Sequence, residues 1–274
     1  MLRTRVITAV AVLPVVLGML AWSPGWAWSL FAAAIVLVGC WEWSRMCGFT
    51  EQEQRGYVVF SGTIAGALVA LYLVSALRLY SGISHALLWT AAAFWVLIVP
   101  LWLARSLRPA PVVLGIAGWV VLWPLWVALV DLRDRDRWLL LAVALIVWIA
   151  DIAAYFAGRR FGRRKLAPHI SPGKTWEGAW GALAAVFAYG LVLLTWASGG
   201  FAPSAWWLLF LAALAALTAA SIVGDLYESW IKRGAGVKDS SNLLPGHGGL
   251  LDRIDALTST LPLAALMVSY KGAA

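Results

Sequence analysis

Charged side chains are scarce in this chain of 274 residues, since Asp, Glu, Lys and Arg together make up 12% of it. That is about half the share found in soluble globular domains, so an ordinary soluble fold is excluded. The two cysteines, Cys40 and Cys47, form no disulfide framework, and the three histidines lack the Cys/His spacing of a zinc centre. Hydrophobic residues instead form 62% of the chain, which is typical of a protein that crosses a membrane several times.

Nine hydrophobic segments follow one another, and most approach the roughly 20 residues that a helix needs to cross the hydrocarbon core. We therefore expect an all-α polytopic integral membrane protein with about nine transmembrane helices. Pro14, Pro100 and Pro124 are expected to kink their helices, which a membrane bundle tolerates. The segments cover residues 6–22, 26–43, 57–77, 86–104, 110–132, 138–158, 178–198, 204–224 and 253–270.

The first segment has features of both a signal peptide and a retained helix. Arg3 and Arg5 precede it, and Ala21-Trp22-Ser23 has the small-x-small spacing of a cleavage site. Pro24 would follow the cut directly, which is a poor context for cleavage, and a second segment begins within a few residues. We therefore expect the first helix to be retained.

Basic residues are divided unevenly between the two sides of the membrane that these segments define. One side receives the N-terminus, both large polar loops and 16 of the 21 Lys and Arg residues, whereas the other side receives five. Because cytoplasmic loops carry the excess of positive charge, the N-terminus and both polar loops are predicted to be cytoplasmic. The same asymmetry accounts for the net charge of +8, which therefore does not indicate binding to nucleic acid.

The chain shows no internal repeat and no low-complexity linker, which favours one continuous membrane domain. Within it, residues 1–137 are expected to form N-terminal transmembrane helices. Residues 138–274 are expected to form a catalytic transmembrane region with two cytoplasmic polar loops, because costly ionisable groups are concentrated there.

The first polar loop follows a helix with an acid inside an apolar run. Asp151, Tyr155 and Gly158 are spaced at i, i+4 and i+7, so they share one helix face. Asp151 is therefore either a carboxylate that faces an active cavity or a structural partner of a neighbouring group. The loop itself holds six basic residues, of which Arg159, Arg160, Arg163 and Arg164 have the pattern of ordinary interfacial anchors.

The segment Ser171-Pro172-Gly173-Lys174-Thr175 combines a turn, two hydroxyls and a lysine directly before a helix. A helix N-terminus favours bound anions, so the lysine and hydroxyls are candidates to hold phosphate. The end of the segment is similar to that of a Walker A loop. However, Pro168 stands where that motif has its first glycine, and no strand is expected before it, which excludes a P-loop.

The second polar loop begins on the eighth segment, where two acids, a hydroxyl and a base recur at i, i+3, i+4 and i+7. They share one face if the helix continues past the membrane surface. Asp252 and Asp255 can meet this face from the last helix, and carboxylates from two helices form an oxygen site suited to Mg²⁺. The alternative is a charged interfacial turn with scattered ion pairs. The members of the face are Asp225, Glu228, Ser229 and Lys232.

Glycines surround a histidine in Gly246-His247-Gly248-Gly249. Such glycines indicate a backbone with unusual dihedral angles or a close approach to a ligand. A lone histidine often makes only a structural hydrogen bond, but its three glycine neighbours make His247 a candidate site residue.

The second polar loop resembles the signature of phosphatidate cytidylyltransferases, also called CDP-diacylglycerol synthases. Asp151 with Tyr155, residues 171–178 and residues 224–229 are similar to further segments of that family, so the resemblance covers about residues 148–255. The signature residues are Ser229-x-Ile231-Lys232-Arg233-x4-Lys238-Asp239-x-Ser241-x2-Leu244-Pro245-x-His247-Gly248-Gly249-Leu250-x-Asp252-Arg253-Ile254-Asp255.

The resemblance implies a Mg²⁺-dependent enzyme of a bacterial inner membrane that makes CDP-diacylglycerol and pyrophosphate from CTP and phosphatidic acid. By position, Asp225 and Asp252 would be the leading metal ligands, while Asp151 and Asp255 would support them or hold a second cation. The further catalytic candidates it implies are Lys238, Asp239 and His247, and the substrate-binding candidates are Ser171, Lys174, Thr175, Glu228, Ser229, Lys232, Arg233 and Arg253.

Two other functions stay open on the residues alone. A transporter of an organic anion also places charges inside a bundle, although it more typically has paired broken helices in two related halves. A CTP-dependent lipid-alcohol kinase is the nearest enzymatic alternative, and its products would be CDP and a phospholipid. A CDP-alcohol phosphotransferase is excluded because the motif Asp-Gly-x2-Ala-Arg is absent from the sequence. The sequence is compatible with a homodimer but does not establish the oligomeric state.

Overall fold

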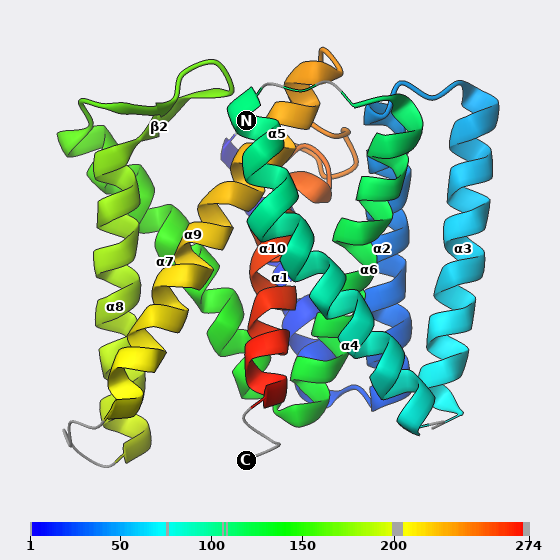
Figure 1. The fold of residues 1–274 in the computed structure, drawn as a ribbon, viewed down its shortest axis with the longest axis horizontal. Helices are drawn as coiled ribbons and strands as arrows, with labels where there is room; N and C mark the ends of the chain where they lie inside the picture. Colours follow the sequence, from blue (N-terminus) through cyan, green and yellow to red (C-terminus); the bar gives the residue numbers. More distant parts are fainter. Residues whose placement is uncertain (1, 75–76, 106, 108, 199–204, 271–274) are drawn as a thin grey trace.

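The computed structural model describes residues 2–74, 77–105, 107, 109–198 and 205–270. Figure 1 shows a bundle of long helices with a small hairpin at one end. The elements are α1 (Leu2–Trp22), α2 (Gly25–Met46), α3 (Glu51–Leu73), α4 (Leu77–Ala93), the π-helical segment η1 (Phe94–Ile98), α5 (Val99–Arg105), α6 (Pro111–Arg135), α7 (Arg137–Phe161), β1 (Lys165–Ala167), β2 (Ser171–Thr175), α8 (Trp176–Ser198), α9 (Ala205–Gly234) and α10 (Leu251–Tyr270).

Seven helical runs in the described part of the chain are long and apolar enough to cross a membrane. They are α2, α3, α6, α7, α8, α9 and the run Leu79–Arg105 that joins α4, η1 and α5. The shorter apolar helix of α1, Val10–Trp22, and the central helix α10 complete the set. This arrangement confirms the expected helical membrane bundle with about nine spanning helices.

Helix α10 is the least apolar of these helices because it lies inside the bundle. It packs against α6 and α9, and Figure 1 shows it between them. Thr258, Ser259 and Thr260 are buried, and Ser259 Oγ donates a hydrogen bond of 2.8 Å to the Ala220 carbonyl of α9. A helix shielded from lipid can hold such polar side chains.

Two helices differ from the sequence prediction, one in where it ends and one in the width of its turns. Helix α9 continues to Gly234, ten residues beyond the predicted end at residue 224, so the polar face from Asp225 to Lys232 is helical. In the third membrane run, the helix widens into η1 immediately before Pro100. Proline lacks the N–H that would close a regular turn, and a π-helical turn accommodates that loss.

The first polar loop contains a short antiparallel hairpin, which corrects the expectation of a turn without strands. Lys165 pairs with Thr175 and Ala167 pairs with Ser171. The Glu177 carboxylate accepts the backbone N–H groups of Arg163 and Arg164, so it anchors the chain where it enters the hairpin. The strand pattern was hidden because β2 contains Pro172 and Gly173, which normally weaken strands.

Helices α7 and α8 pack closely through glycines. A Cβ atom at Gly178 would lie 2.9 Å from the Ala154 carbonyl oxygen, and one at Gly181 would collide with the Ala157 Cβ. Small residues let helix backbones approach one another in membranes, where van der Waals packing replaces the hydrophobic effect between helices. This contact fixes the position of the hairpin that connects the two helices.

All the polar connections predicted to share one side of the membrane lie at the same end of the bundle. Figure 1 shows α2, α5, α7 and α9 ending, and α3, α6, α8 and α10 beginning, toward the end that carries the hairpin. At the opposite end, Arg133, Arg135 and Arg137 donate hydrogen bonds to the carbonyls of Ser23, Val268 and Ala21. The cytoplasmic location of the hairpin end stays a prediction.

Candidate active site

A cavity of about 430 Å³ lies between α7, the hairpin, α8 and α9. Its walls include five of the predicted catalytic, binding or metal-ligating residues, although these come from three separate elements. The acid of α7, the loop segment and the acid of α9 therefore meet at one place. The five residues are Asp151, Ser171, Lys174, Thr175 and Asp225.

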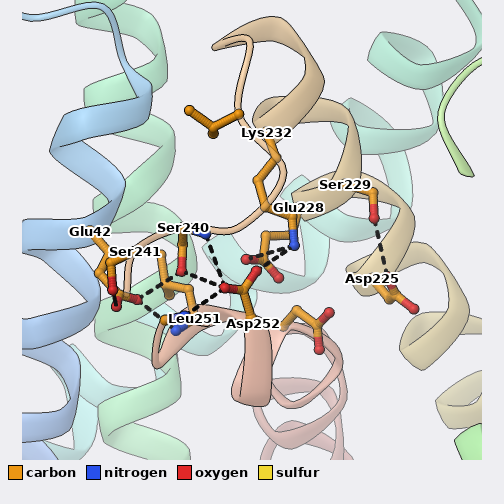
Figure 2. Close-up of polar contacts among 12 residues, drawn as sticks. Glu42, Asp225, Glu228, Ser229, Lys232, Ser240, Ser241, Leu251 and Asp252 are labelled. Carbon is orange, nitrogen blue, oxygen red and sulfur yellow. Dashed lines mark hydrogen bonds and ion pairs between the residues drawn. The ribbon is translucent and has the colours of Figure 1, made fainter. Parts of the chain in front are cut away.

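An ion pair crosses this cavity. Lys174 Nζ on β2 lies 2.5 Å from Asp225 Oδ2 on α9, and both side chains are partly exposed. Ser229, one turn further along α9, donates a hydrogen bond of 3.3 Å to Asp225 Oδ1 (Figure 2). The hairpin thus places the Lys174 ammonium against the Asp225 carboxylate in the cavity.

Thr175 has a structural role at the same place. Its side chain is buried, and its Oγ1 accepts the Gly178 backbone N–H at 3.1 Å. This is the N-cap hydrogen bond of α8. The hydroxyl also occupies the space that a Cβ would need at Gly158. Contact of Thr175 with a substrate stays a prediction, whereas its capping of α8 is plain in the structure.

Acidic side chains from three helices gather beside this ion pair. Asp151 and Asp255 each lie close enough to Asp225 to interact with it electrostatically. Glu228 adjoins Asp255, and both of its buried carboxylate oxygens lack a hydrogen bond of good geometry within the described residues. The nearest cation to Glu228 is Lys232, whose Nζ lies 3.4 Å from Oε1.

The signature loop is organised around Asp252 (Figure 2). Lys232 Nζ lies 2.6 Å from Asp252 Oδ1, while Oδ2 accepts the backbone N–H groups of Gly249 at 2.7 Å and Ser240 at 3.0 Å. The Ser240 hydroxyl also lies 3.0 Å from Oδ2. Asp252 stands in the first turn of α10, ahead of the apolar part of that helix.

Glu42 of α2 completes this arrangement and was missed by the sequence interpretation. Its side chain is fully buried, and its carboxylate receives hydrogen bonds from two hydroxyls and two backbone N–H groups of the signature loop (Figure 2). An ionisable residue inside an apolar span is by default a candidate functional residue, and that rule could have identified it. The donors are Ser241 Oγ at 2.5 Å, Ser240 Oγ at 3.1 Å, Leu250 N at 2.9 Å and Leu251 N at 2.7 Å.

Two predicted site residues lie away from the cavity that holds Asp225. His247 and Arg253 line a separate, largely apolar cavity of about 350 Å³ among α1, α2, α6, α7 and α10. Successive residues turn by about 100° around a helix, so Arg253 points away from the face that carries Asp252 and Asp255. The structure therefore does not bring His247 or Arg253 to the acidic cluster.

Three further predicted residues lie at the exposed end of α9 and on the turn after it. Arg233, in the last turn of α9, donates to the Val237 carbonyl at 3.2 Å and so ties that turn to the helix. Lys238 and Asp239 are exposed, and neither forms an ion pair with another described residue. These side chains face solvent at the hairpin end of the bundle rather than the cavity.

The carboxylates of this region suit a hard cation such as Mg²⁺, which prefers oxygen ligands. Glu228, with Lys232 3.4 Å from its Oε1, adds a buried carboxylate beside Asp255 and supports that fit. However, among the residues that the structure describes, no three acids, histidines or cysteines form a preassembled ligand set. Asp252 in particular already has partners for both oxygens. Mg²⁺ binding therefore stays a prediction.

The chain is similar to known proteins over nearly its whole length. The model of the cytidylyltransferase family matches residues 3–271. A phosphatidate cytidylyltransferase of Pseudomonas aeruginosa is 43% identical over 278 residues, which cover 99% of this chain and 98% of the relative. An enzyme of the same name from Haemophilus influenzae is 34% identical, and the match covers 96% of each chain. One from Brucella suis is 38% identical, and the match covers 97% of this chain and 92% of the relative. The chain therefore belongs to the cytidylyltransferase family.

Proposed function

We propose that this protein transfers the cytidylyl group of CTP to phosphatidic acid, giving CDP-diacylglycerol and pyrophosphate. The relatives named above carry that activity in their names and are similar over nearly the whole chain. The observation that carries the proposal is the Lys174–Asp225 ion pair in a cavity walled by membrane helices. Such a cavity offers a cation for phosphate and acids for a metal ion within reach of lipid.

Lys174 is the candidate contact for the triphosphate. Its ammonium now rests on Asp225, and an incoming phosphate would take its place as the anionic partner. The hairpin holds Lys174 and Ser171 above the start of α8, where backbone N–H groups favour anions. A lysine in this position neutralises part of the charge that two anionic reactants bring together.

Asp225, Glu228 and Asp255 would hold Mg²⁺, with Asp151 on the adjoining cavity wall. Their carboxylates interact with one another, and Glu228 is buried with Lys232 as its neighbouring cation. Asp252 would stay beside them, held by Lys232 and by the backbone N–H groups of Ser240 and Gly249. When bound, Mg²⁺ would offset the negative charge of the triphosphate and polarise its phosphorus–oxygen bonds. Lys232, positioned by Asp252, would present its ammonium to the departing pyrophosphate.

The reaction requires positioning more than acid–base chemistry. A phosphate oxygen of the lipid forms a bond to the α-phosphorus of CTP, and the bond to the β-phosphate oxygen breaks with its electron pair. The lipid phosphate is already ionised near neutral pH, so a strong general base is not required. The residues of this chain therefore act by holding two anions in line and by stabilising pyrophosphate as it leaves.

The cavity would receive its two substrates from different directions. Tyr155, which lines it, and the neighbouring Phe156 of α7 are both exposed on the outer surface of the bundle, where lipid would contact them. CTP would enter from the hairpin end. The 16-to-5 asymmetry of basic residues supports a cytoplasmic hairpin end in a bacterial inner membrane.

Product analysis tests this function directly. Purified protein in lipid nanodiscs is incubated with labelled CTP and phosphatidic acid, with Mg²⁺ or with a chelator. Formation of CMP-lipid and pyrophosphate supports the proposal, whereas CDP and a phosphorylated lipid alcohol, formed when diacylglycerol is offered instead, would establish the kinase. Asp225→Asn should nearly abolish turnover, while Asp136→Asn, a matched change at the opposite end of the bundle, should leave turnover intact. Normal turnover in Asp225→Asn would remove Asp225 from the site.

A further inference from the structure

Glu42 connects the N-terminal helices to the signature loop. It lies on α2, is fully buried, and receives all four of its hydrogen bonds from residues 240–251. A buried carboxylate without partners would be costly, and a simple packing position would carry an apolar side chain. The charge of Glu42 is therefore matched to one specific segment of the chain.

Part of this match is a capping interaction made by another helix. Leu250 and Leu251 stand at the start of α10, where backbone N–H groups have no partner within the helix. The two oxygens of Glu42 accept these groups at 2.9 Å and 2.7 Å. An anion at a helix N-terminus also interacts favourably with the helix dipole. Glu42 thus fixes where α10 begins.

Ser240 carries the effect of Glu42 to Asp252. Its hydroxyl lies 3.1 Å from Glu42 Oε2 and 3.0 Å from Asp252 Oδ2, so the two carboxylates share its single proton. Asp252 in turn holds Lys232 at 2.6 Å (Figure 2). Ser241 differs, because its hydroxyl bonds Glu42 and has no hydrogen bond to Asp252. Ser240 therefore connects Glu42 to Asp252, whereas Ser241 only attaches the loop to Glu42.

The glycines of the signature loop make room for this contact. A Cβ atom at Gly249 would lie 2.5 Å from Glu42 Oε1 and would collide with Ser240 Oγ. Gly248 has a φ of +87°, and its Cβ would lie 2.7 Å from Asp252 Oδ2. The consecutive glycines thus allow both carboxylates to approach the backbone.

We propose that Glu42 is a positioning residue of the active site, which acts through Ser240 to set the Asp252–Lys232 pair. This inference rests on the proposed function, since it assigns that pair to cytidylyl transfer. It predicts that a residue of α2, remote from the cavity wall, controls the rate of the chemical step. It also predicts that substrate affinity, which depends on Lys174 and the cavity, changes less.

The test compares Glu42→Gln, Ser240→Ala and Ser241→Ala with wild type in nanodiscs, using labelled CTP and phosphatidic acid. Glu51→Gln, a change at an exposed glutamate of α3, is the matched control. Misplacement by a fraction of an ångström lowers rates steeply, so Glu42→Gln should reduce kcat by roughly tenfold to a hundredfold. Its KM for CTP should change by less than about threefold, because uniform binding is untouched.

The serines distinguish positioning from a structural role. Ser240→Ala should reduce kcat by roughly tenfold, and Ser241→Ala by about twofold or less. The double variant Ser240→Ala with Glu42→Gln should have a kcat close to that of Glu42→Gln alone, because both changes break the same connection from Glu42 to Asp252. Equal effects of the two serine changes, or losses that multiply in the double variant, would overturn the inference. If the Glu42→Gln variant does not insert into the membrane, the kcat values of Ser240→Ala and Ser241→Ala alone decide whether the inference holds.

Hydrogen exchange provides a readout that does not depend on activity. Glu42→Gln should speed amide exchange in peptides that cover residues 249–252 and leave those of the hairpin unchanged. Unchanged exchange at residues 249–252 would overturn the inference. Absence of cytidylyl transfer by the wild type would instead refute the proposed function, so the two failures are distinguishable.

Discussion

The change Gly249→Ala measures how tightly the signature loop encloses its carboxylates. The new methyl group would stand 2.5 Å from Glu42 Oε1 and closer still to Ser240 Oγ. Overpacking of this kind costs about 1–3 kcal/mol, and displacing Glu42 would sacrifice hydrogen bonds to a charged group worth about 1.5–3 kcal/mol each. We therefore expect the free energy of unfolding to fall by about 2–4 kcal/mol.

The assay is unfolding of the purified protein by SDS in mixed micelles, followed by loss of helical signal. Gly62→Ala is the control, because its Cβ would meet nothing within 4 Å inside α3 and it should gain about 0.5–1 kcal/mol. The double variant Ser240→Ala with Gly249→Ala should lose less than the sum of the single changes, since one collision is removed. An unfolding free energy for Gly249→Ala within about 0.5 kcal/mol of wild type would refute the steric argument.

Four further outcomes follow from the contacts of the site. Lys174→Ala should raise the KM for CTP more than it lowers kcat, with exposed Lys165→Ala as the control in the same kinetic assay. Chelation of divalent ions should stop product formation, and added Mg²⁺ should restore it in a radiolabel assay. Gly181→Val should lower the free energy of unfolding in SDS by about 1–3 kcal/mol, because its side chain meets Ala157. Lys232→Met should lower the free energy of unfolding by roughly 3–5 kcal/mol, since two buried carboxylates lose their cation. A loss below about 1 kcal/mol would contradict the buried ion pairs.

Local spacing was sufficient for the parts of the site that lie on one element. The i, i+3, i+4 and i+7 pattern from Asp225 to Lys232 needed only a helix that continues, and α9 does continue. The hydrophobic segments likewise predicted the bundle, because length and apolarity are properties of each helix alone. Lys174 and Asp225 were both proposed as site residues, and the structure joins them in one ion pair.

Contacts between distant elements could not be predicted in the same way. Glu42 and Ser240 are 198 residues apart, and no periodicity within either segment indicates the other. The signature also grouped Arg253 with Asp252, whereas adjacent residues of a helix face different directions. Membership in a motif therefore identified the important segment but not the side on which each residue acts.

The tie between Glu42 and the signature loop constrains how the protein is made. Ribosomes synthesise the chain from its N-terminus, so α2 reaches the bilayer about 200 residues before the serines and amides that receive its charge. Until then, Glu42 lies in a partly synthesised helical bundle without the donors that its carboxylate has in the complete protein. A translation product that stops short of residue 240 lacks all four donors to the Glu42 carboxylate, so we expect its helices to pack less stably than those of the full chain.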